Sequence, residues 1–452
     1  MKALLVNPWI CDFAAYDLWL RPFGLLRAGT VLRRWGWEVE LLDCLDRFDP
    51  DLKDNSGEIL PRRDRDGRGK YPRTPVGKPE AIAEVERPYF RYGLPPELAR
   101  RRLEERERPD LILAGTTMTY WYPGYLESLE LAREVFPSVP MILGGLYPRL
   151  CPDHARARSG ADIVLTGGGW GELAASIAGL GLPPPPPVGD DVIPAYDLLR
   201  DRSALAVRTG RGCPHSCSYC AAALLEPELL RRTPESIAAE IAGYRDRYGT
   251  TDIAFYDNAL LFDSPNHLDR ILSLLLHRGI RVRFHTPNGL HARFLTPETA
   301  GLMKESGFLQ PRLGLESSRA EVQQRTGGKV ANRDLIRALD RLETAGFLRP
   351  EIIVYLMIGL PGQRPREAEA DIRFVHSLGA TISLAAYSPI PGTADYLALV
   401  RRGEIPADLD PLWQNNTIFC PRQGVFTLEA VRWLRQLAGE LNRKLPGAEM
   451  EC

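Results

Sequence analysis

The chain has 452 residues, more than one domain needs to bury a core, so we expect at least two domains. Its 57 basic and 58 acidic side chains leave a formal net charge of −1, so no overall positive field attracts nucleic acid or an anionic membrane. The eight cysteines are too scattered for a disulfide framework, and no apolar run is long enough to span a bilayer. With no secretory pattern near its start, the sequence predicts a cytoplasmic protein with a small-molecule or peptide substrate.

The first part of the chain alternates short apolar runs with amphipathic stretches, which is typical of a parallel sheet covered by helices. The expected helices are Arg21–Trp35, Pro95–Arg106 and Gly124–Val135. The expected strands are Lys2–Val6, Trp37–Leu42, Asp110–Gly115, Pro140–Leu143 and Asp162–Thr166. Residues 48–92 are charged and lack apolar periodicity, so they predict a long surface excursion. Residues 1–181 thus predict a doubly wound α/β domain of Rossmann or flavodoxin-like type.

Five consecutive prolines at 183–187 cannot continue a helix or complete a strand ladder, so residues 182–200 are expected to form a proline-rich linker. A second series of strands separated by helical stretches follows. These strands are expected at Leu205–Arg208, Asp252–Tyr256, Val282–His285, Pro311–Leu315, Ile352–Ile358 and Thr381–Ala385. The pattern predicts a partial (βα)6 barrel over residues 201–400, with its site at the strand carboxyl ends. Residues 401–452 are expected to form a helical extension.

Three cysteines, Cys213, Cys217 and Cys220, follow the strand Leu205–Arg208 in a glycine-containing loop. Three thiolates within eight residues converge on one point and suit a soft metal or an iron-sulfur centre, and three ligands leave one iron of a cubane open. A structural zinc site with His215 or a distant cysteine as fourth ligand is the alternative. Zinc sites more often have paired C-x2-C knuckles, and the sequence has no second knuckle.

The C-x3-C-x2-C spacing, with Tyr219 before the last cysteine, resembles the signature of the radical S-adenosylmethionine (SAM) superfamily. The resemblance implies that Cys213, Cys217 and Cys220 hold one [4Fe-4S] cluster whose open iron is chelated by SAM. It further implies that an electron from the cluster cleaves SAM to methionine and a 5′-deoxyadenosyl radical. An external donor such as flavodoxin or ferredoxin would supply that electron. Cys420 and Cys452 are too few to hold a second cluster.

Residues at the ends of the later strands resemble the SAM-contacting positions of that superfamily. The implied SAM-binding residues are Tyr219, Asp257, Glu316, Ser317, Gly359, Tyr387 and Pro389. Each also has a simpler explanation: Asp257 with Asn258 can cap a turn, the glycines can simply turn the chain, and Glu316 can be a surface carboxylate. The commoner Gly-Gly-Glu pattern after the second strand is absent, so the binding of the SAM amino group is left open.

The first domain resembles the cobalamin-binding module that precedes many radical SAM barrels. The matching segments are Arg21–Leu25, Asp43, Thr116-Thr117, Gly144-Gly145 and Gly167–Gly169. The resemblance implies that Thr116, Thr117, Gly144, Gly145, Gly167 and Gly168 contact cobalamin, with the nucleotide tail beside Gly144 and Gly145. No Asp-x-His-x-x-Gly sequence follows the first strand, so a histidine is not expected to ligate cobalt. A flavodoxin-like domain with no ligand, or with part of the substrate, fits the same residues.

Together the resemblances predict a cobalamin-dependent radical SAM methyltransferase that acts on an unactivated carbon. One alternative keeps the barrel but makes the reaction a cyclisation, rearrangement or oxidation without methyl transfer. Another alternative is a non-catalytic metal-binding protein. The aromatic run Tyr120-Trp121-Tyr122 is expected to pack in the core or else to line a cleft.

Overall fold

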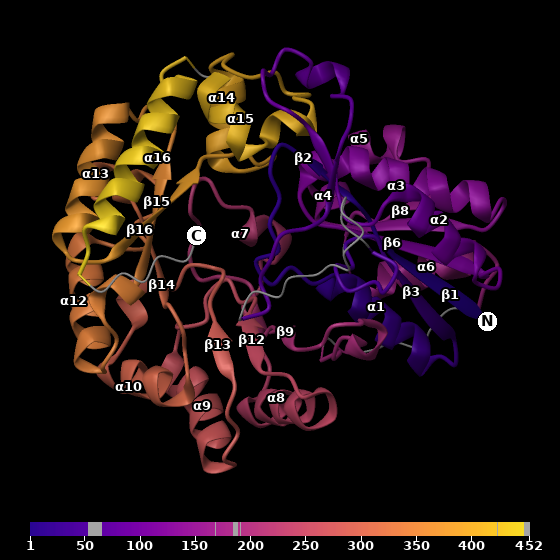
Figure 1. Ribbon diagram of the computed structural model, residues 1–452, viewed down its shortest axis with the longest axis horizontal. Coiled ribbons are helices and arrows are strands. Elements are labelled where there is room, and N and C mark those ends of the chain that lie inside the picture. Colours follow the sequence, from indigo (N-terminus) through magenta and orange to yellow (C-terminus); the bar gives the residue numbers. More distant parts are fainter. Residues whose placement is uncertain (53–65, 168, 184–188, 190, 423, 447–452) are drawn as a thin grey trace. The chain divides into compact units, whose positions relative to one another are not determined.

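The computed structural model describes residues 1–52, 66–167, 169–183, 189, 191–422 and 424–446. The chain divides into two compact units (Figure 1). The first contains Met1–Arg202 together with Asp410–Gln414, and the second contains Ser203–Leu409 and the segment that begins at Asn415. None of the helices in the described ranges combines the length and the apolar character that a bilayer crossing requires.

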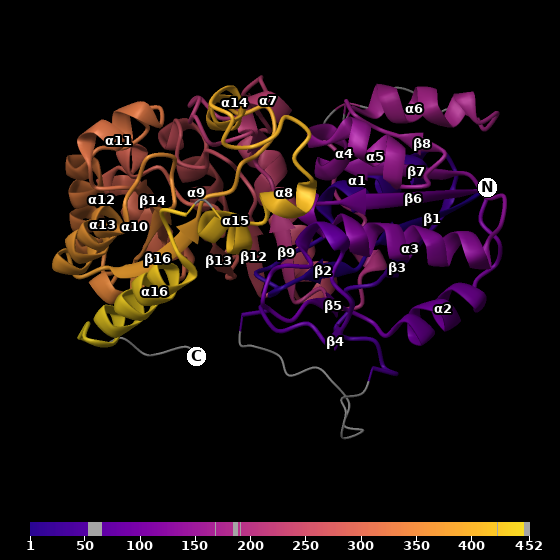
Figure 2. The ribbon, with the colours of Figure 1, turned by 90° about the horizontal axis from the view of Figure 1, so that it is seen from above.

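The first unit is built on a five-stranded parallel sheet with the order β3-β1-β6-β7-β8, the doubly wound arrangement that the sequence predicts. Its strands are β1 (Lys2–Asn7), β3 (Glu38–Asp43), β6 (Leu111–Thr116), β7 (Met141–Gly145) and β8 (Ile163–Val164). Its helices are α1 (Phe23–Arg34), α2 (Pro96–Glu104), α3 (Tyr122–Val135), α4 (Leu146–Leu150), α5 (Pro152–Arg158) and α6 (Trp170–Gly179). Helices cover both faces of the sheet (Figure 2). Buried Leu5, Leu32 and Leu113 join the sheet to α1 in one apolar core.

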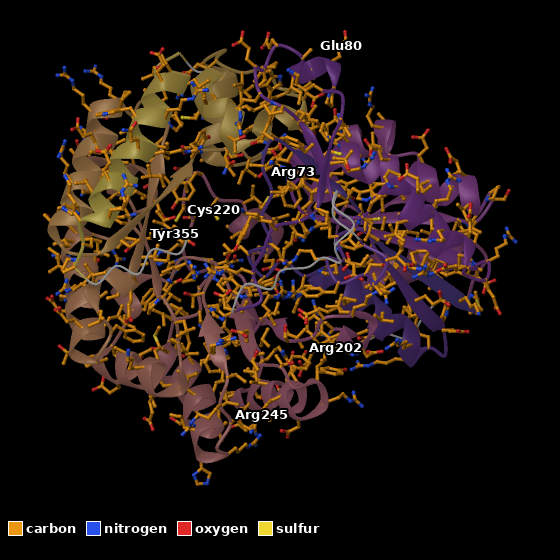
Figure 3. The ribbon with its side chains drawn as sticks, in the orientation of Figure 1. Arg73, Glu80, Arg202, Cys220, Arg245 and Tyr355 are labelled. Atoms are coloured by element: carbon orange, nitrogen blue, oxygen red, sulfur yellow. The ribbon has the colours of Figure 1, made fainter. Side chains whose placement is uncertain are left out.

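Part of the expected surface excursion is a small antiparallel sheet. Its strands are β2 (Ile10–Asp12), β5 (Phe90–Tyr92) and β4 (Arg73–Pro75), in that order. Strands of three residues are too short to show a periodic pattern, which is why the sequence did not reveal them. Guanidinium groups on aromatic rings stabilise this sheet: Arg73 (labelled in Figure 3) lies 4.4 Å from the Phe90 ring centroid, and Arg91 lies 5.3 Å from that of Trp9. The remainder of the excursion, residues 53–65, lies outside the described residues.

The residues before the second unit pack on α1. Arg27 Nε donates to the Val192 carbonyl at 3.0 Å, and the Ala195 amide donates to the Leu26 carbonyl at 3.1 Å. Tyr196 is completely buried. The prolines at 184–187 lie outside the described residues, so the proline-rich linker expected over 182–200 stays a prediction.

The second unit contains two three-stranded parallel sheets, with the orders β13-β12-β9 and β14-β15-β16. A parallel bridge between Leu290 and Leu313 connects them, so the six strands follow one another as in the expected partial barrel. The strands are β9 (Ala204–Val207), β12 (Asp252–Phe255), β13 (Arg283–His285), β14 (Arg312–Glu316), β15 (Ile353–Ile358) and β16 (Thr381–Ala386). A short hairpin of β10 (Gly210–Arg211) and β11 (Leu230–Arg231) follows β9.

Helices cover the outside of this barrel in alternation with the strands (Figure 1). They are α7 (Ala222–Leu225), α8 (Pro234–Tyr248), α9 (Leu268–His277), α10 (Pro297–Ser306), α11 (Ala320–Arg325), α12 (Asn332–Thr344), α13 (Pro365–Ser377), α14 (Ala394–Arg401), α15 (Asn416–Arg422) and α16 (Leu428–Arg443). In the C-terminal extension, α16 protects the edge strand β16, because the Asn442 side chain bonds both the amide and the carbonyl of Ile382 at 2.9 Å. Residues 410–414 of the expected extension belong to the first unit.

Candidate functional site

The cysteine loop leaves the carboxyl end of β9, where the sequence predicts it. Cys213 and Cys217 are half-buried, Cys220 is exposed, and all three are free thiols. Burial raises the pKa of Cys213 and Cys217, and repulsion from Cys220 adds to both shifts, whereas Lys329 lowers both. The three sulfur atoms therefore share one electrostatic neighbourhood, with a cation beside them.

The chemistry of the donor set fits an iron-sulfur cluster, because three thiolates can each bind a different iron of a cubane. Within the described residues, no three cysteine, histidine or carboxylate side chains form a group that would hold one metal ion. His215 is turned instead toward His291 and Phe294, whose ring centroids lie 5.0 and 5.7 Å away.

Glu316, at the end of β14, is the centre of a charged group next to the cysteine loop. The Tyr219 hydroxyl donates to Glu316 Oε1 at 3.0 Å, and the Lys329 ammonium forms an ion pair with the same oxygen. Lys329 Nζ also lies 5.8 Å from the centroid of the Tyr219 ring. Burial opposes the charge of Lys329, but Glu316 and the thiols outweigh it and raise the lysine pKa. The sequence analysis did not identify Lys329. The preceding Gly327-Gly328 pair, which indicates a tight turn, was the feature that could have pointed to it.

Backbone strain marks the same place. Glu316 has a φ of +67°, and the β14–β15 register shifts between Gly314 and Glu316. A non-glycine residue in the left-handed region is costly, and such strain concentrates at binding and active sites. Gly327, with a φ of +111°, lies against Cys217, because a Cβ there would approach the Cys217 Cα at 3.0 Å. The loop that carries Lys329 and the loop that carries the cysteines are therefore packed together.

Asp257, after β12, is engaged within the protein. Its carboxylate accepts hydrogen bonds from the Thr209 amide at 3.0 Å and from the Thr209 hydroxyl at 2.6 Å. Burial raises its pKa, and the bonds from Thr209 partly offset that effect. In this structure Asp257 fixes the start of the cysteine loop, because Thr209 lies four residues before Cys213.

The other expected SAM residues of the barrel are packed into the protein. Ser317 is buried, and its Oγ accepts the Arg319 amide at 3.2 Å. Gly359 has a φ of +78°, and a Cβ there would collide with the Cys420 thiol. Tyr387 is completely buried against Phe419, and Pro389 is also buried. Each of these residues thus has a structural explanation, and Tyr219 and Glu316 remain the expected SAM residues that the structure brings together.

At the carboxyl edge of the first sheet, the expected cobalamin residues satisfy one another. The Thr116 hydroxyl donates to the Gly144 carbonyl at 2.8 Å and accepts the Tyr147 amide at 3.2 Å. The Thr117 amide donates to the Tyr125 hydroxyl at 3.1 Å. Gly145 has a φ of +106°, and a Cβ there would collide with the Thr116 carbonyl. Thr116 therefore holds the ends of β6 and β7 together, and Thr117 joins the end of β6 to α3.

Next to these bonds the same edge presents open apolar surface. Met118 is 44% exposed and Leu146 is 37% exposed, one or two residues beyond the paired ends Thr116 and Gly145. Gly144 leaves room above the backbone, because a Cβ there would meet only Leu165, at an ordinary 3.4 Å. Gly167 is exposed and donates its amide to Glu172 at 2.8 Å, while Gly168 lies outside the described residues.

The run of three aromatics after β6 packs inside the first unit. Trp121 is buried and donates its indole N–H to Asp12 at 2.7 Å. The Tyr122 and Tyr147 rings stack with centroids 6.0 Å apart. The packing interpretation of this run therefore accounts for its contacts.

The fold and the cysteine loop define the class of the second unit. Residues 207–375 match the profile of the radical SAM superfamily, so this part of the chain is a radical SAM domain. Among curated proteins, the chain is 23% identical over 271 residues to the threonylcarbamoyladenosine tRNA methylthiotransferase MtaB of Thermotoga maritima, which is 56% of this chain and 60% of that protein. It is 24% identical over 228 residues to the dual-specificity RNA methyltransferase RlmN of Xanthobacter autotrophicus, which is 45% of this chain and 54% of that one.

Two solved structures resemble most of the chain. The radical SAM methyltransferase TsrM from Kitasatospora setae, with tryptophan substrate and a SAM analogue bound, superposes with a TM-score of 0.64 at 16% identity, over 89% of this chain and 76% of that one. The cobalamin-dependent SAM radical enzyme OxsB superposes with a TM-score of 0.56 at 14% identity, over 92% of this chain and 56% of that one. At these identities the likeness establishes the α/β fold.

Proposed function

We propose that this chain is a radical SAM enzyme that holds one [4Fe-4S] cluster on Cys213, Cys217 and Cys220 and cleaves SAM reductively. The single observation that carries the proposal is the cysteine loop at the first strand end of a radical SAM domain. When bound, the cluster supplies the electron that splits SAM into methionine and a 5′-deoxyadenosyl radical. The chain's own residues position SAM against it. A flavodoxin or a ferredoxin is the proposed electron donor.

Glu316, Tyr219 and Lys329 are the proposed SAM-binding group. A carboxylate at a barrel strand end, beside the cluster cysteines, is placed to accept hydrogen bonds from an ammonium or from ribose hydroxyls. The Lys329 ammonium, held beside the same carboxylate, supplies a positive charge for the SAM carboxylate. Because Lys329 and Tyr219 already orient Glu316, the group needs little rearrangement when SAM arrives.

Cobalamin is the proposed ligand of the first unit. Gly144 permits close approach of a bulky ring, and exposed Met118 and Leu146 offer apolar contact beside it. TsrM and OxsB, whose folds resemble this one, have both been solved with cobalamin bound. When bound, cobalamin carries a methyl group between SAM and a substrate, so methyl transfer to an unactivated carbon is the proposed reaction.

A second candidate reaction keeps both cofactors but transfers no methyl group. The OxsB match favours it, because that protein is described as a cobalamin-dependent SAM radical enzyme and not as a methyltransferase. The balanced charge of the chain supports a small-molecule or peptide substrate over the RNA substrates of the curated relatives.

Anaerobic reconstitution tests the proposal in two steps. Four irons per chain and dithionite-dependent formation of 5′-deoxyadenosine are expected, whereas zinc in the loop or a lack of reductive cleavage would contradict the enzyme assignment and favour a non-catalytic metal-binding protein. Incubation with SAM bearing a deuterated methyl group then separates the two candidate reactions. Label in the product supports methyl transfer, and unlabelled product supports a cyclisation, rearrangement or oxidation.

A further inference from the structure

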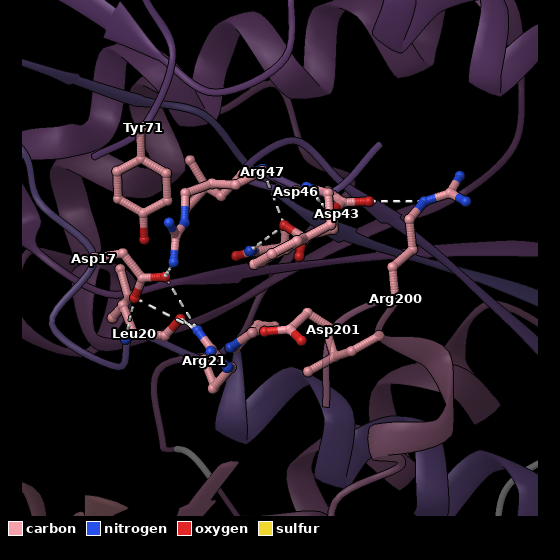
Figure 4. Close-up of a pocket in the computed structure, with 14 residues that line it drawn as sticks. Asp17, Leu20, Arg21, Asp43, Asp46, Arg47, Tyr71, Arg200 and Asp201 are labelled. Atoms are coloured by element: carbon pink, nitrogen blue, oxygen red, sulfur yellow. Dashed lines mark hydrogen bonds and ion pairs between the residues drawn. The ribbon is translucent and has the colours of Figure 1, made fainter. Parts of the chain in front are cut away.

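A polar pocket lies at the carboxyl ends of β1 and β3 in the first unit (Figure 4). The empty space along its lining is about 380 Å³, a volume that includes open solvent. The pocket includes Asn7 at the end of β1, and β1 and β7 are two positions apart in the sheet order β3-β1-β6-β7-β8, which at about 4.8 Å per strand is about 10 Å. The pocket therefore lies beside the glycine edge at Gly144, and its Arg21 and Asp43 belong to segments that resemble the cobalamin-binding module.

A buried ion-pair network forms one wall of this pocket. Asp17 accepts hydrogen bonds from Arg47 Nη2 at 2.9 Å, from Arg21 Nη1 at 3.3 Å and from the Leu20 amide at 2.7 Å. These bonds use both oxygens of the carboxylate. Arg47 is almost completely buried, and its Nε and Nη1 bond no acceptor among the described residues. Nη1 lies against Gly69, so these two donors are enclosed by the protein.

Two polar atoms of the pocket lining, the Tyr71 hydroxyl and Asp43 Oδ2, bond no described residue. The Tyr71 side chain is only 6% exposed and lines the pocket, and its hydroxyl bonds no residue in the described part of the chain. Asp43 Oδ1 accepts hydrogen bonds from the Asn7 side-chain amide at 2.6 Å and from the Leu45 backbone amide at 3.0 Å. No described residue donates to Asp43 Oδ2. Figure 4 shows Tyr71, Arg47 and Asp43 gathered around one space. The pocket therefore offers an unused hydroxyl on one side and an unused carboxylate oxygen on the other.

The charge of the lining decides between ligand classes. Three arginines (Arg21, Arg47 and Arg200) face four aspartates (Asp17, Asp43, Asp46 and Asp201), so the lining has no excess positive charge for an anion. A bare cation would leave the Tyr71 hydroxyl without an acceptor. A neutral group that both donates and accepts hydrogen bonds satisfies both Tyr71 and Asp43.

We propose that this pocket binds a neutral, hydroxyl-bearing ring, with one hydroxyl donating to Asp43 and an adjacent one accepting from Tyr71. A vicinal diol of the kind found in a ribose or another sugar has this chemistry. The position fits the general preference of open α/β sheets to bind ligands at the carboxyl ends of their strands. The proposal depends neither on SAM cleavage nor on cobalamin.

Saturation-transfer NMR on the full chain tests the pocket with methyl β-D-ribofuranoside as the probe. Transfer to the sugar protons is expected, and blocking the 2,3-diol as an isopropylidene ketal should abolish it. Asp43→Asn replaces the free acceptor with a donor, and Tyr71→Phe removes the free hydroxyl. Each variant should weaken binding at least tenfold.

The matched control is Tyr89→Phe, which removes a buried hydroxyl of the same unit that is bonded to the Cys11 carbonyl at 2.9 Å. Binding by this variant should equal that of the unmodified chain, and near-ultraviolet circular dichroism checks that all three variants are folded. Equal binding of the blocked sugar, binding of inorganic phosphate in its place, or no transfer from any sugar would overturn the diol assignment. Displacement of the sugar by hydroxocobalamin would show that the pocket belongs to the cobalamin site and would overturn its independence.

Discussion

The two strand-end regions of this protein are prepared for ligands in opposite ways. In the radical SAM domain, Glu316 is held by an ion pair and a hydrogen bond on a strained backbone. At the glycine edge of the first unit, the Thr116 hydroxyl donates a hydrogen bond within the protein, to the Gly144 carbonyl. The open surface there consists of Gly144 and the exposed apolar side chains of Met118 and Leu146. The first arrangement suits a small charged ligand recognised by a few groups. The second suits a large ring recognised through shape and area.

Removal of a cluster ligand should have the largest effect on the charged site. We expect Cys217→Ala to lower reductive SAM cleavage to background, since a cubane with two cysteine ligands is not retained. Formation of 5′-deoxyadenosine and iron content measure this loss. The matched control is Cys151→Ala in the first unit, which should keep both. If the Cys217 variant still cleaved SAM, Cys217 would not be a cluster ligand, and the barrel strand ends could no longer be regarded as the SAM site.

Replacement of the buried cation comes next. Lys329→Met leaves the Glu316 carboxylate buried without its ion-pair partner, which costs about 3 kcal/mol of stability. The same change should raise the KM for SAM about tenfold or more, while Lys444→Met, at an exposed position just after α16, should change neither quantity. Denaturant unfolding and cleavage kinetics measure the two effects. An unchanged KM would remove Lys329 from the SAM site.

Two neighbouring glycines sharpen the comparison at the glycine edge. Gly145→Ala places a side chain at a φ of +106° against the Thr116 carbonyl, so it should cost about 1–3 kcal/mol of stability. Gly144→Ala meets only Leu165 and should change stability by about 0.5 kcal/mol or less. If a corrin ring rests there, Gly144→Ala should nevertheless reduce cobalamin retention several-fold. Full retention, seen in the absorption spectrum of reconstituted protein, would place the ring elsewhere.

The pocket at Asp43 predicts a pH effect. Burial raises the pKa of Asp43 to about 7, while an unfolded aspartate titrates near 4. Between these values the unfolded chain binds fewer protons, so the stability contributed by this group falls as pH rises from about 4 to about 7. Asp43→Asn lacks this dependence. The stability of the unmodified chain relative to the variant should therefore fall by roughly 1 to 3 kcal/mol over that range, as measured by urea unfolding.

The smallest expected effect concerns Tyr387. Its hydroxyl is buried without a partner among the described residues, so Tyr387→Phe should be neutral or stabilise the fold by about 1 kcal/mol. Because the side chain is completely enclosed, SAM cleavage should not change. A loss of cleavage with a raised KM for SAM would instead support the SAM contact that the family resemblance implies for this residue.

Local pattern determined much of this protein in advance. The five strands of the first sheet, the six of the barrel and the place of the cysteine loop all follow from apolar periodicity and from residue spacing, which act over a few residues. The assignment of Cys213, Cys217 and Cys220 as cluster ligands rests on the same local spacing and stays a prediction. The family resemblance gives Tyr219 and Glu316 as SAM-binding residues, and that role also stays a prediction.

Only tertiary structure decided the rest, because it depends on contacts between distant segments. The pairing of Lys329 with Glu316 joins a loop to a strand end, and Gly359 is required by a thiol 61 residues further along the chain, Cys420. Tyr387 is enclosed by packing that its own neighbours in sequence do not reveal. The order in residues 66–92 comes from guanidinium groups that lie on aromatic rings, as Arg91 does on Trp9, and composition alone made this segment look unstructured. Contacts between distant residues leave no periodic pattern in the sequence, so they could not be predicted from it.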